Sequence, residues 1–208
     1  MKKERGERML DSVLPDQELI DLVIQHRGEV TQEALQAAGY SQTEIRQLCR
    51  EQVLVPRGAG YTLENLTAFV DGLVLVQWAV PTGIIGKVSA LVQHEISVAL
   101  AHTIDLCVPA DWQGTFPADL GIRPFVLEPD LREYGVVTVY PTPPGTVPIT
   151  MYAPAVALAQ AWADPTISEE TKEDGLLMYQ AFLEDARALQ EAFDRYGLRM
   201  PGAVQSAR

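Results

Sequence analysis

The chain has 208 residues, of which 47% are hydrophobic, and a formal net charge of −12 at neutral pH. This length and hydrophobic content suffice for one large or two small folded domains, and they exclude a disordered chain. Because an acidic chain as a whole is repelled by polyphosphate, any contact with nucleic acid must come from a locally basic face.

Secretion and membrane insertion are not expected. The N-terminal stretch MKKERGERMLDSVL contains no apolar run of signal-peptide length. The most apolar region, LVLVQWAVPTGIIGKVSALV, is interrupted by Gln77, Pro81 and Lys87, so it falls short of the roughly 18 apolar residues of a membrane span. Cys49 and Cys107 are far apart and have no CxxC partner. We therefore expect a cytoplasmic protein in a reducing compartment, with no contact to membranes.

The acidic charge is unevenly distributed along the chain. Residues 1–62 hold eight Lys or Arg against ten Asp or Glu, whereas residues 63–208 hold eight against eighteen. The weakly charged first part is therefore the better candidate for nucleic-acid contact. Together with the element pattern described below, this predicts the following division: a flexible N-terminus at 1–14, a first domain at 15–63, a second domain at 64–197 and a flexible tail at 198–208.

Three short helices are predicted in the first domain. The segment PDQELIDLVIQHRG begins with Pro15 and ends at Gly28, with an apolar stripe of Leu19, Ile20, Val23 and Ile24. Thr31 can cap a second helix that extends through Ala38, with Ala34, Leu35 and Ala38 facing inward. Gly39 then provides the turn.

The third helix begins with a capping box, formed by Ser41 and Glu44. Its predicted inward residues are Ile45, Leu48 and Cys49, and its outward residues are Gln42, Thr43, Arg46, Gln47 and Arg50. Two extended runs, VLVP and YTL, follow on either side of the glycine-rich turn 57–60 and predict a β-hairpin.

This order of elements is that of a winged helix-turn-helix, a module that binds double-stranded DNA. Its third helix is short enough to lie in a major groove roughly 12 Å wide, where exposed side chains contact base edges and phosphates. Arg57, on the hairpin, would lie beside the phosphate backbone of the DNA.

The second domain is predicted to mix helices with a small sheet. Helical spacing continues from a possible cap at Asn65 to near Pro81, and VSALVQHEI suggests another buried helix. Four β-rich runs follow, and a final helical region closes the chain. The fold class predicted is therefore α+β: an N-terminal winged helix-turn-helix followed by a mixed α/β domain with a small sheet and C-terminal helices. The four β-rich runs are HTIDLCVP, IRPFVLEP, GVVTVYPT and VPITMYAP.

Several stretches, taken in order, resemble the AbiEi family. They are AGYSQTEIRQLCREQVLVPRGAGYTL, then VPTGIIGKVSALVQHEI, and then IDLCVPAD and ITMYAPAVALAQAW. The similarity covers roughly residues 15–190, and its most telling part is Ser89-Ala90-Leu91 with His94 after a VP-type turn. Members of this family are antitoxins and transcriptional regulators of type IV toxin-antitoxin and abortive-infection systems.

The resemblance implies a function for each domain. The N-terminal module would bind operator DNA and commonly repress its own operon, as part of antiviral defence, while the C-terminal domain would carry antitoxic activity. The implied counterpart is a nucleotidyltransferase-like toxin, with functional pairing and no direct contact implied.

The residues expected to contact DNA all lie in the first domain. Three arginines on one protomer would neutralise about three phosphates, which favours a homodimer on an inverted repeat. The glutamines and Thr43 could bond adenine or phosphate, or they could be ordinary exposed polar residues. The predicted DNA-binding residues are Thr31, Gln32, Ser41, Gln42, Thr43, Arg46, Gln47, Arg50 and Arg57.

No catalytic residue, metal site or cofactor is predicted. His94, His102 and Cys107 do not form a ligand cluster in the sequence, and a histidine on an apolar helix is usually a core residue. Asp105 and Glu128 resemble the paired acids of nucleases, but the acid-x-Lys element is missing. Neither a GxxxxGK[ST] loop nor a GxSxG elbow occurs. The alternative to DNA binding is a protein-interaction module with a degenerate winged helix, whose acidic face binds a basic partner.

Overall fold

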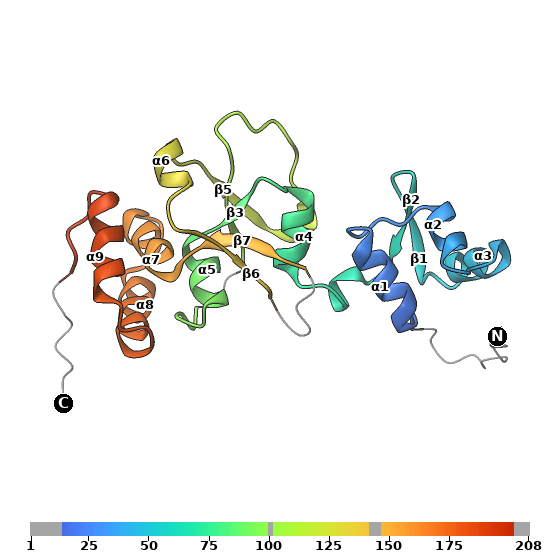
Figure 1. Ribbon diagram of the computed structural model, residues 1–208, viewed down its shortest axis with the longest axis horizontal. Helices are drawn as coiled ribbons and strands as arrows, with labels where there is room; N and C mark the ends of the chain where they lie inside the picture. The colour runs from blue at the N-terminus through green and yellow to red at the C-terminus, as the bar shows by residue number, and fades with distance from the viewer. Residues whose placement is uncertain (1–13, 100–101, 142–146, 202–208) are drawn as a thin grey trace. The chain divides into compact units, whose positions relative to one another are not determined.

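A computed structural model of the chain describes residues 14–99, 102–141 and 147–201. The chain forms two compact units, Met1–Val70 and Asp71–Arg208 (Figure 1). The mixed α+β class is confirmed: N-terminal helices with a two-stranded hairpin are followed by a five-stranded mixed sheet and C-terminal helices. Of the ends predicted to be flexible, residues 1–13 and 202–208 lie outside the described part of the chain.

The first unit contains three helices, α1 (Gln17–Gln25), α2 (Gln32–Ala37) and α3 (Gln42–Arg50). Their predicted inward faces supply the core of this unit, in which Leu19, Val23, Leu35 and Ile45 are almost completely buried. Ala38, which was predicted to face inward, is exposed. The reason is that α2 has already ended, and Ala38 is its C-cap.

A hairpin of β1 (Leu54–Arg57) and β2 (Gly60–Leu63) completes the first unit. Val30 adds a single bridge to β2: it exchanges two backbone hydrogen bonds with Tyr61, at 2.8 and 2.9 Å. Gly60 allows this approach, because a Cβ atom at this position would lie only 2.5 Å from the carbonyl oxygen of Val30. The hairpin is thereby joined to the segment between α1 and α2.

The predicted helix from Asn65 to Pro81 is wrong in its first half. Asn65 makes no side-chain cap, and only a short 3₁₀ turn, η1 (Leu66–Ala68), follows it. The helix α4 (Gly72–Ala79) begins after Asp71, whose carboxylate accepts a hydrogen bond from the backbone N–H of Leu73 at 2.7 Å. The helical spacing of the apolar residues therefore spanned two elements.

The second unit is built around a mixed sheet with the strand order β5-β4-β3-β7-β6. Each of the four predicted β-rich runs contains one strand. The strand that the sequence analysis missed is β3, in the middle of the sheet, which pairs antiparallel with β4 and parallel with β7. The strands are β3 (Ile84–Ile85), β4 (Ile104–Cys107), β5 (Ile122–Phe125), β6 (Val136–Val139) and β7 (Ile149–Tyr152).

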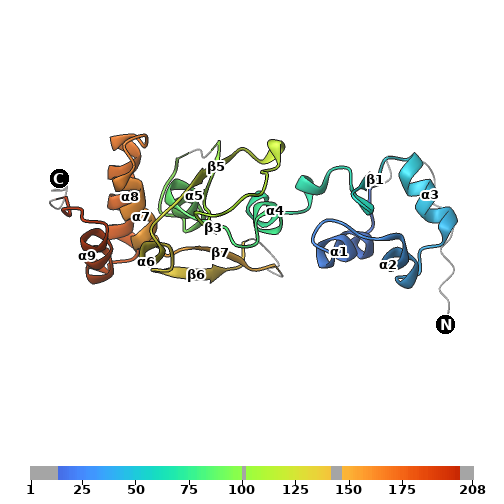
Figure 2. The ribbon, with the colours of Figure 1, turned by 90° about the horizontal axis from the view of Figure 1, so that it is seen from above.

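Helix α7 (Pro154–Ala163) forms the centre of the second unit's core. Its residues 155–161 are all buried, as expected for a helix that is covered on every side. It packs against α5 (Lys87–Gln93), α8 (Glu169–Phe182) and α9 (Ala186–Arg195), and α5 in turn contacts β4 and β7 (Figure 2). Two short pieces, η2 (Ala118–Leu120) and α6 (Pro129–Arg132), lie in the connections on either side of β5.

The helical spacing of the sequence also predicts a wide apolar stripe along the last helices, formed by Leu176, Leu177, Tyr179, Phe182, Leu183, Ala186, Leu189 and Phe193. Only half of these residues are buried. Leu176, Tyr179, Leu189 and Phe193 are buried as expected. The helical conformation is interrupted between α8 and α9, where Glu184 adopts a positive φ of 51°. The apolar positions of the two helices therefore do not form one continuous stripe. The apolar residues on either side of this interruption are therefore exposed, namely Phe182, Leu183 and Ala186, and Leu177 within α8 is exposed as well.

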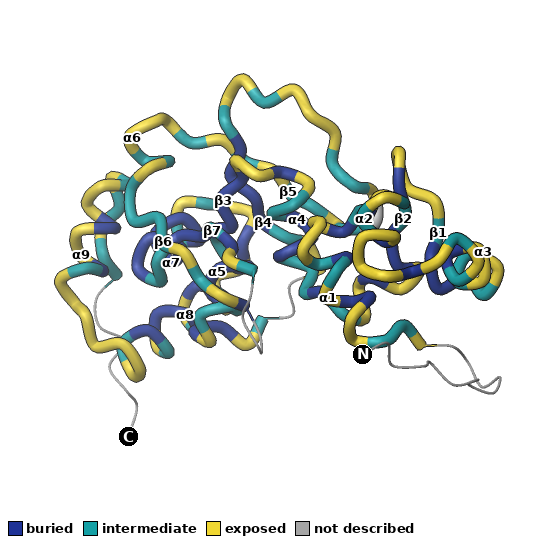
Figure 3. Tube along the Cα trace, turned by 45° about the vertical axis from the view of Figure 1, so that its right-hand side comes forward, coloured by how far each residue is buried: buried dark blue, intermediate teal, exposed yellow. Residues whose placement is uncertain are grey.

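The helices and strands differ in how far they are buried. Figure 3 shows β3 and much of α7 as buried, whereas much of the surface of α3 is exposed. Among the described residues, no helix is both long enough and apolar enough to cross a bilayer.

Candidate nucleic-acid interface

The turn between α2 and α3 is fixed by capping at both helix starts. The Thr31 hydroxyl accepts a hydrogen bond from the backbone N–H of Ala34 at 3.2 Å. Ser41 and Glu44 form the predicted reciprocal capping box: the Glu44 N–H donates to the Ser41 hydroxyl at 3.2 Å, and the Ser41 N–H donates to the Glu44 carboxylate at 2.7 Å. Gly39, with a φ of +98°, allows the reversal between the helices. The side chains of Thr31 and Ser41 are thus used to start helices.

The outer face of α3 carries four exposed side chains, those of Thr43, Arg46, Gln47 and Arg50. The Gln47 amide donates to the Glu51 carboxylate at 2.8 Å, and the Arg50 Nε donates to the Arg46 carbonyl oxygen at 3.4 Å. The second bond leaves the remaining guanidinium nitrogens of Arg50 available to an external acceptor.

Arg57 lies at the end of β1 and is exposed at the tip of the hairpin. Within the described ranges of the chain, no ion pair involves Arg46, Arg50 or Arg57. An exposed guanidinium without a carboxylate partner retains its full charge and its fork of donors for a phosphate or a base edge. The three predicted arginines therefore share the property that anion contact requires.

Glu29, which the sequence analysis did not select, supports the hairpin tip. Its carboxylate accepts a hydrogen bond from the Ala59 N–H at 3.2 Å, and a Cβ atom on Gly58 would lie 2.7 Å from the same oxygen. The carboxylate is therefore packed against the turn next to Arg57. No local sequence pattern indicated this contact, because Glu29 and Ala59 are thirty positions apart.

Three glutamine amides form a cluster where α2 meets the start of α3. The Gln42 Oε1 accepts hydrogen bonds from the Nε2 atoms of Gln32 at 3.1 Å and Gln36 at 3.2 Å. The Gln42 Nε2 donates to the Gln32 Oε1 at 3.4 Å. Gln42 and Gln32 are half-buried, whereas Gln36 is exposed. Gln42 is therefore held within the protein, and Gln36 is a member that the sequence analysis missed although it lies one helical turn after Gln32.

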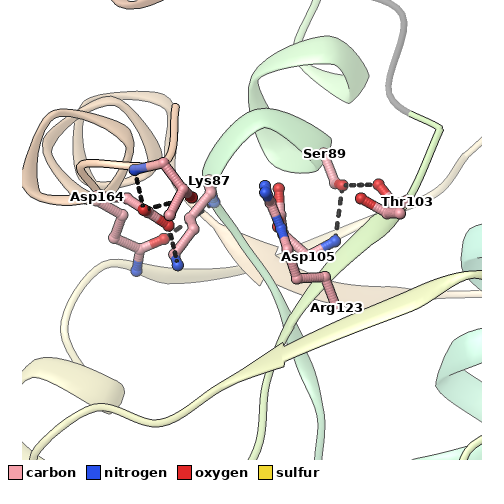
Figure 4. A network of polar contacts seen from close by, with 8 residues as sticks. Lys87, Ser89, Thr103, Asp105, Arg123 and Asp164 are labelled. Carbon is pink, nitrogen blue, oxygen red and sulfur yellow. Dashed lines mark hydrogen bonds and ion pairs between the residues drawn. The ribbon is translucent and has the colours of Figure 1, made fainter. Parts of the chain in front are cut away.

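The second unit contains a separate group of buried and half-buried charges (Figure 4). The Lys87 ammonium contacts the Asp164 carboxylate at 2.6 Å, with each side chain 13% exposed, and it lies 4.2 Å from the centroid of the Phe125 ring. Burial acts to raise the pKa of Asp164, but hydrogen bonds from Lys87 and Thr166 outweigh it and hold this pKa below its usual value. This ion pair joins the start of α5 to the end of α7.

Asp105, one of the two acids compared with nuclease residues, is buried beside this group. Its carboxylate contacts the Arg123 Nε at 2.5 Å, and its backbone N–H donates to the Ser89 hydroxyl at 2.9 Å. Glu128 is exposed and lies at the N-cap of α6. The Asp105 carboxylate is thus used in an ion pair between neighbouring strands.

His94, His102 and Cys107, which were considered as metal ligands, lie in different surroundings. The His94 ring Nε2 lies 3.0 Å from the Tyr152 carbonyl oxygen, and burial lowers the pKa of His94 more than this contact raises it. His102 is exposed, while Cys107 is buried and its thiol pKa is raised mainly by burial. Across the described residues, no group of three or more His, Cys, Asp or Glu side chains could hold a metal ion.

Neither a protein-family model nor a curated protein sequence matches this chain.

Proposed function

We propose that the protein is a DNA-binding transcriptional regulator, in which α2, the turn and α3 act as a helix-turn-helix and the β1–β2 hairpin acts as its wing. In this arrangement α3 enters the major groove, and the hairpin lies beside the phosphate backbone. The order of the elements, the capped start of α3 and the exposure of its outer face support this proposal.

The observation that carries the proposal is the exposure of Arg46, Arg50 and Arg57 and their lack of carboxylate partners among the described residues. All three are exposed, and in the described part of the chain none forms an ion pair. Two acids of the same module, Glu29 and Glu51, accept hydrogen bonds from the hairpin and from a glutamine, so their carboxylates are held by these groups and not by the three arginines. A cationic surface can therefore exist on a chain with a net charge of −12.

Three phosphate contacts per protomer give only modest affinity, so we propose that two copies bind an inverted repeat. The regulator would act on its own operon, and by its resemblance to AbiEi proteins it would be the antitoxin of a type IV system in the cytoplasm. Its functional counterpart would be a nucleotidyltransferase-like toxin. A nucleotidyltransferase-like gene beside its own would support this part of the proposal.

Salt-dependent binding of the purified chain to duplex DNA from its own upstream region tests the proposal. In fluorescence anisotropy, the logarithm of the association constant should fall with the logarithm of salt concentration with a slope of about −3 for one protomer and about −6 for two. A scrambled duplex serves as the control for sequence preference. Absence of binding at 50 mM salt would exclude DNA recognition by this module.

A second candidate function, binding of a basic protein partner, is favoured by the exposed apolar residues in the second half of α8 and at its C-cap. Leu177 is 43% exposed, Phe182 is 70% exposed and Leu183 is 42% exposed, and acidic Glu184 follows them. Exposed apolar groups beside acids suit a basic amphipathic segment. Protein binding that persists in a chain without DNA affinity would favour this function over the first.

Glu29 provides a prediction about the wing. Replacing Glu29 with glutamine retains an oxygen that can accept from the Ala59 N–H, but it removes a negative charge next to Arg57. We expect Glu29→Gln to raise DNA affinity about two- to fivefold at low salt, because a charge that repels phosphate is lost.

The matched change Glu29→Ala also removes the acceptor. It should speed hydrogen exchange of the Ala59 amide, which Glu29→Gln should leave slow, independently of any DNA. Equal affinities for wild-type and Glu29→Gln across the salt range would contradict the electrostatic role of this residue.

A further inference from the structure

The glutamine cluster at the start of α3 leaves a defined set of hydrogen-bonding groups unused. An amide side chain offers two N–H donors and an oxygen with two lone pairs. Both lone pairs of the Gln42 oxygen are used by Gln32 and Gln36. One lone pair of the Gln32 oxygen is used by Gln42. Within the described residues, the Gln36 oxygen accepts no hydrogen bond from the protein.

Gln36 is consequently the outward-facing amide of the three. It is exposed, and it retains one N–H donor and both lone pairs of its oxygen. Gln42 cannot accept a further bond without releasing a neighbour. The orientation of the Gln36 amide is set by its bond to Gln42, so a donor and an acceptor are presented side by side in a fixed order.

The cluster lies on the same side of α3 as the proposed phosphate contacts. Gln42 and Arg46 are four residues apart in one helix, so their side chains project from the same face. Because Gln36 bonds directly to Gln42, its amide lies at the N-terminal edge of this face. In a helix-turn-helix, residues at the N-terminal end of the recognition helix approach the base edges.

We propose that Gln36 recognises an adenine in the major groove, accepting from the adenine N6 amino group and donating to N7, while Gln42 is the positioning residue that holds the Gln36 amide. This inference rests on the proposed DNA-binding function and adds the identity of one base pair, A·T, in each half-site. Side-chain amides and adenine have matching donor and acceptor patterns, whereas guanine offers two acceptors at the same edge. The amide order set by Gln42 therefore favours adenine.

Selection of bound duplexes from a randomised library, followed by affinity measurements on single-base variants, tests the inference. Wild-type protein should select adenine at one position per half-site, by about tenfold over the other bases. Gln36→Ala should lose this preference and retain the preferences at other positions. Gln36→Glu presents only acceptors and loses its bond to the Gln42 oxygen, so it should lose the adenine preference and favour cytosine, whose N4 amino group is a donor to a carboxylate.

Two further variants separate positioning from contact. Gln42→Ala should weaken the adenine preference without creating a preference for cytosine, because the Gln36 amide remains but is no longer held. Gln17→Ala, a change at an exposed glutamine on α1 of the same unit, should select the same sequences as wild type.

The outcomes distinguish this inference from the function on which it rests. If wild-type protein binds no duplex, the proposed function fails and the inference fails with it. If wild-type protein binds but Gln36→Ala and Gln36→Glu select the same sequence as wild type, DNA binding stands and the role of Gln36 is overturned. A cytosine preference that appears in Gln36→Glu, and not in wild type or in Gln42→Ala, supports the direct contact.

Discussion

Replacing Arg46 and Arg50 together with alanine should weaken binding to the upstream duplex roughly 30- to 100-fold at moderate salt, because two phosphate contacts are lost from each protomer. The slope of the salt dependence should become shallower by about 2 per protomer. Anisotropy titrations between 50 and 200 mM salt measure both quantities. Both arginines are exposed, so the folded state should be almost unchanged.

The control for this double change is Arg187→Ala. Arg187 is an exposed arginine on α9 of the second unit, where it pairs with Glu191 at 2.8 Å. Its removal changes the net charge of the protein without altering the α3 face, so affinity should stay within about twofold of wild type. An undiminished affinity in the double variant, at a melting temperature equal to wild type, would remove α3 from the interface.

Replacing Asp164 with alanine should reduce the free energy of unfolding by about 2 to 4 kcal/mol, because the Lys87 ammonium would be left largely buried without its carboxylate. Denaturant unfolding monitored at neutral pH measures the loss. The pKa of folded Asp164 is held below that of an unfolded aspartate, about 3.9. The stabilisation is therefore fully present above that pH and is lost as the pH falls through the folded value.

A matched ion pair on the surface provides the comparison for Asp164→Ala. In Glu191→Ala the partner left behind is Arg187, whose side chain is 89% exposed, so the change should leave the free energy of unfolding almost unchanged. The gap between the two variants should narrow in acid as Asp164 of the wild type becomes protonated. Equal losses at neutral pH would show that burial does not strengthen the Lys87–Asp164 pair.

Local signals in the sequence predicted the elements of the first unit well. The S-x-x-E pattern of Ser41 and Glu44 gave the start of α3, and the glycine at position 39 gave the turn before it. Such signals succeed because a cap and its helix are neighbours in the chain. The same reasoning failed at Asn65, where a more favourable cap, Asp71, was available six residues later.

Contacts between distant segments could not be predicted in this way. The strand β3 has only two residues, too few to give an alternating pattern, and its status depends on partners in β4 and β7. Within the candidate interface, Thr43, Arg46, Gln47, Arg50 and Arg57 are exposed as expected for contacts with DNA. Thr31 and Ser41 are engaged in caps, and Gln42 is held by other amides. Neither Glu29 nor Gln36 was identifiable without knowing what lies beside it.

The short strand β3 has a consequence for how the chain acquires its structure. Both of its neighbours come from later parts of the sequence, so β3 can first pair when β4 has been synthesised, and the sheet of the second unit is joined to β7 only later. The first unit, in contrast, ends at Val70, so all of its contacts can form before the second unit is synthesised. On the ribosome, the first unit should therefore fold early, while the two isoleucines of β3 stay unpaired until β4 has been synthesised.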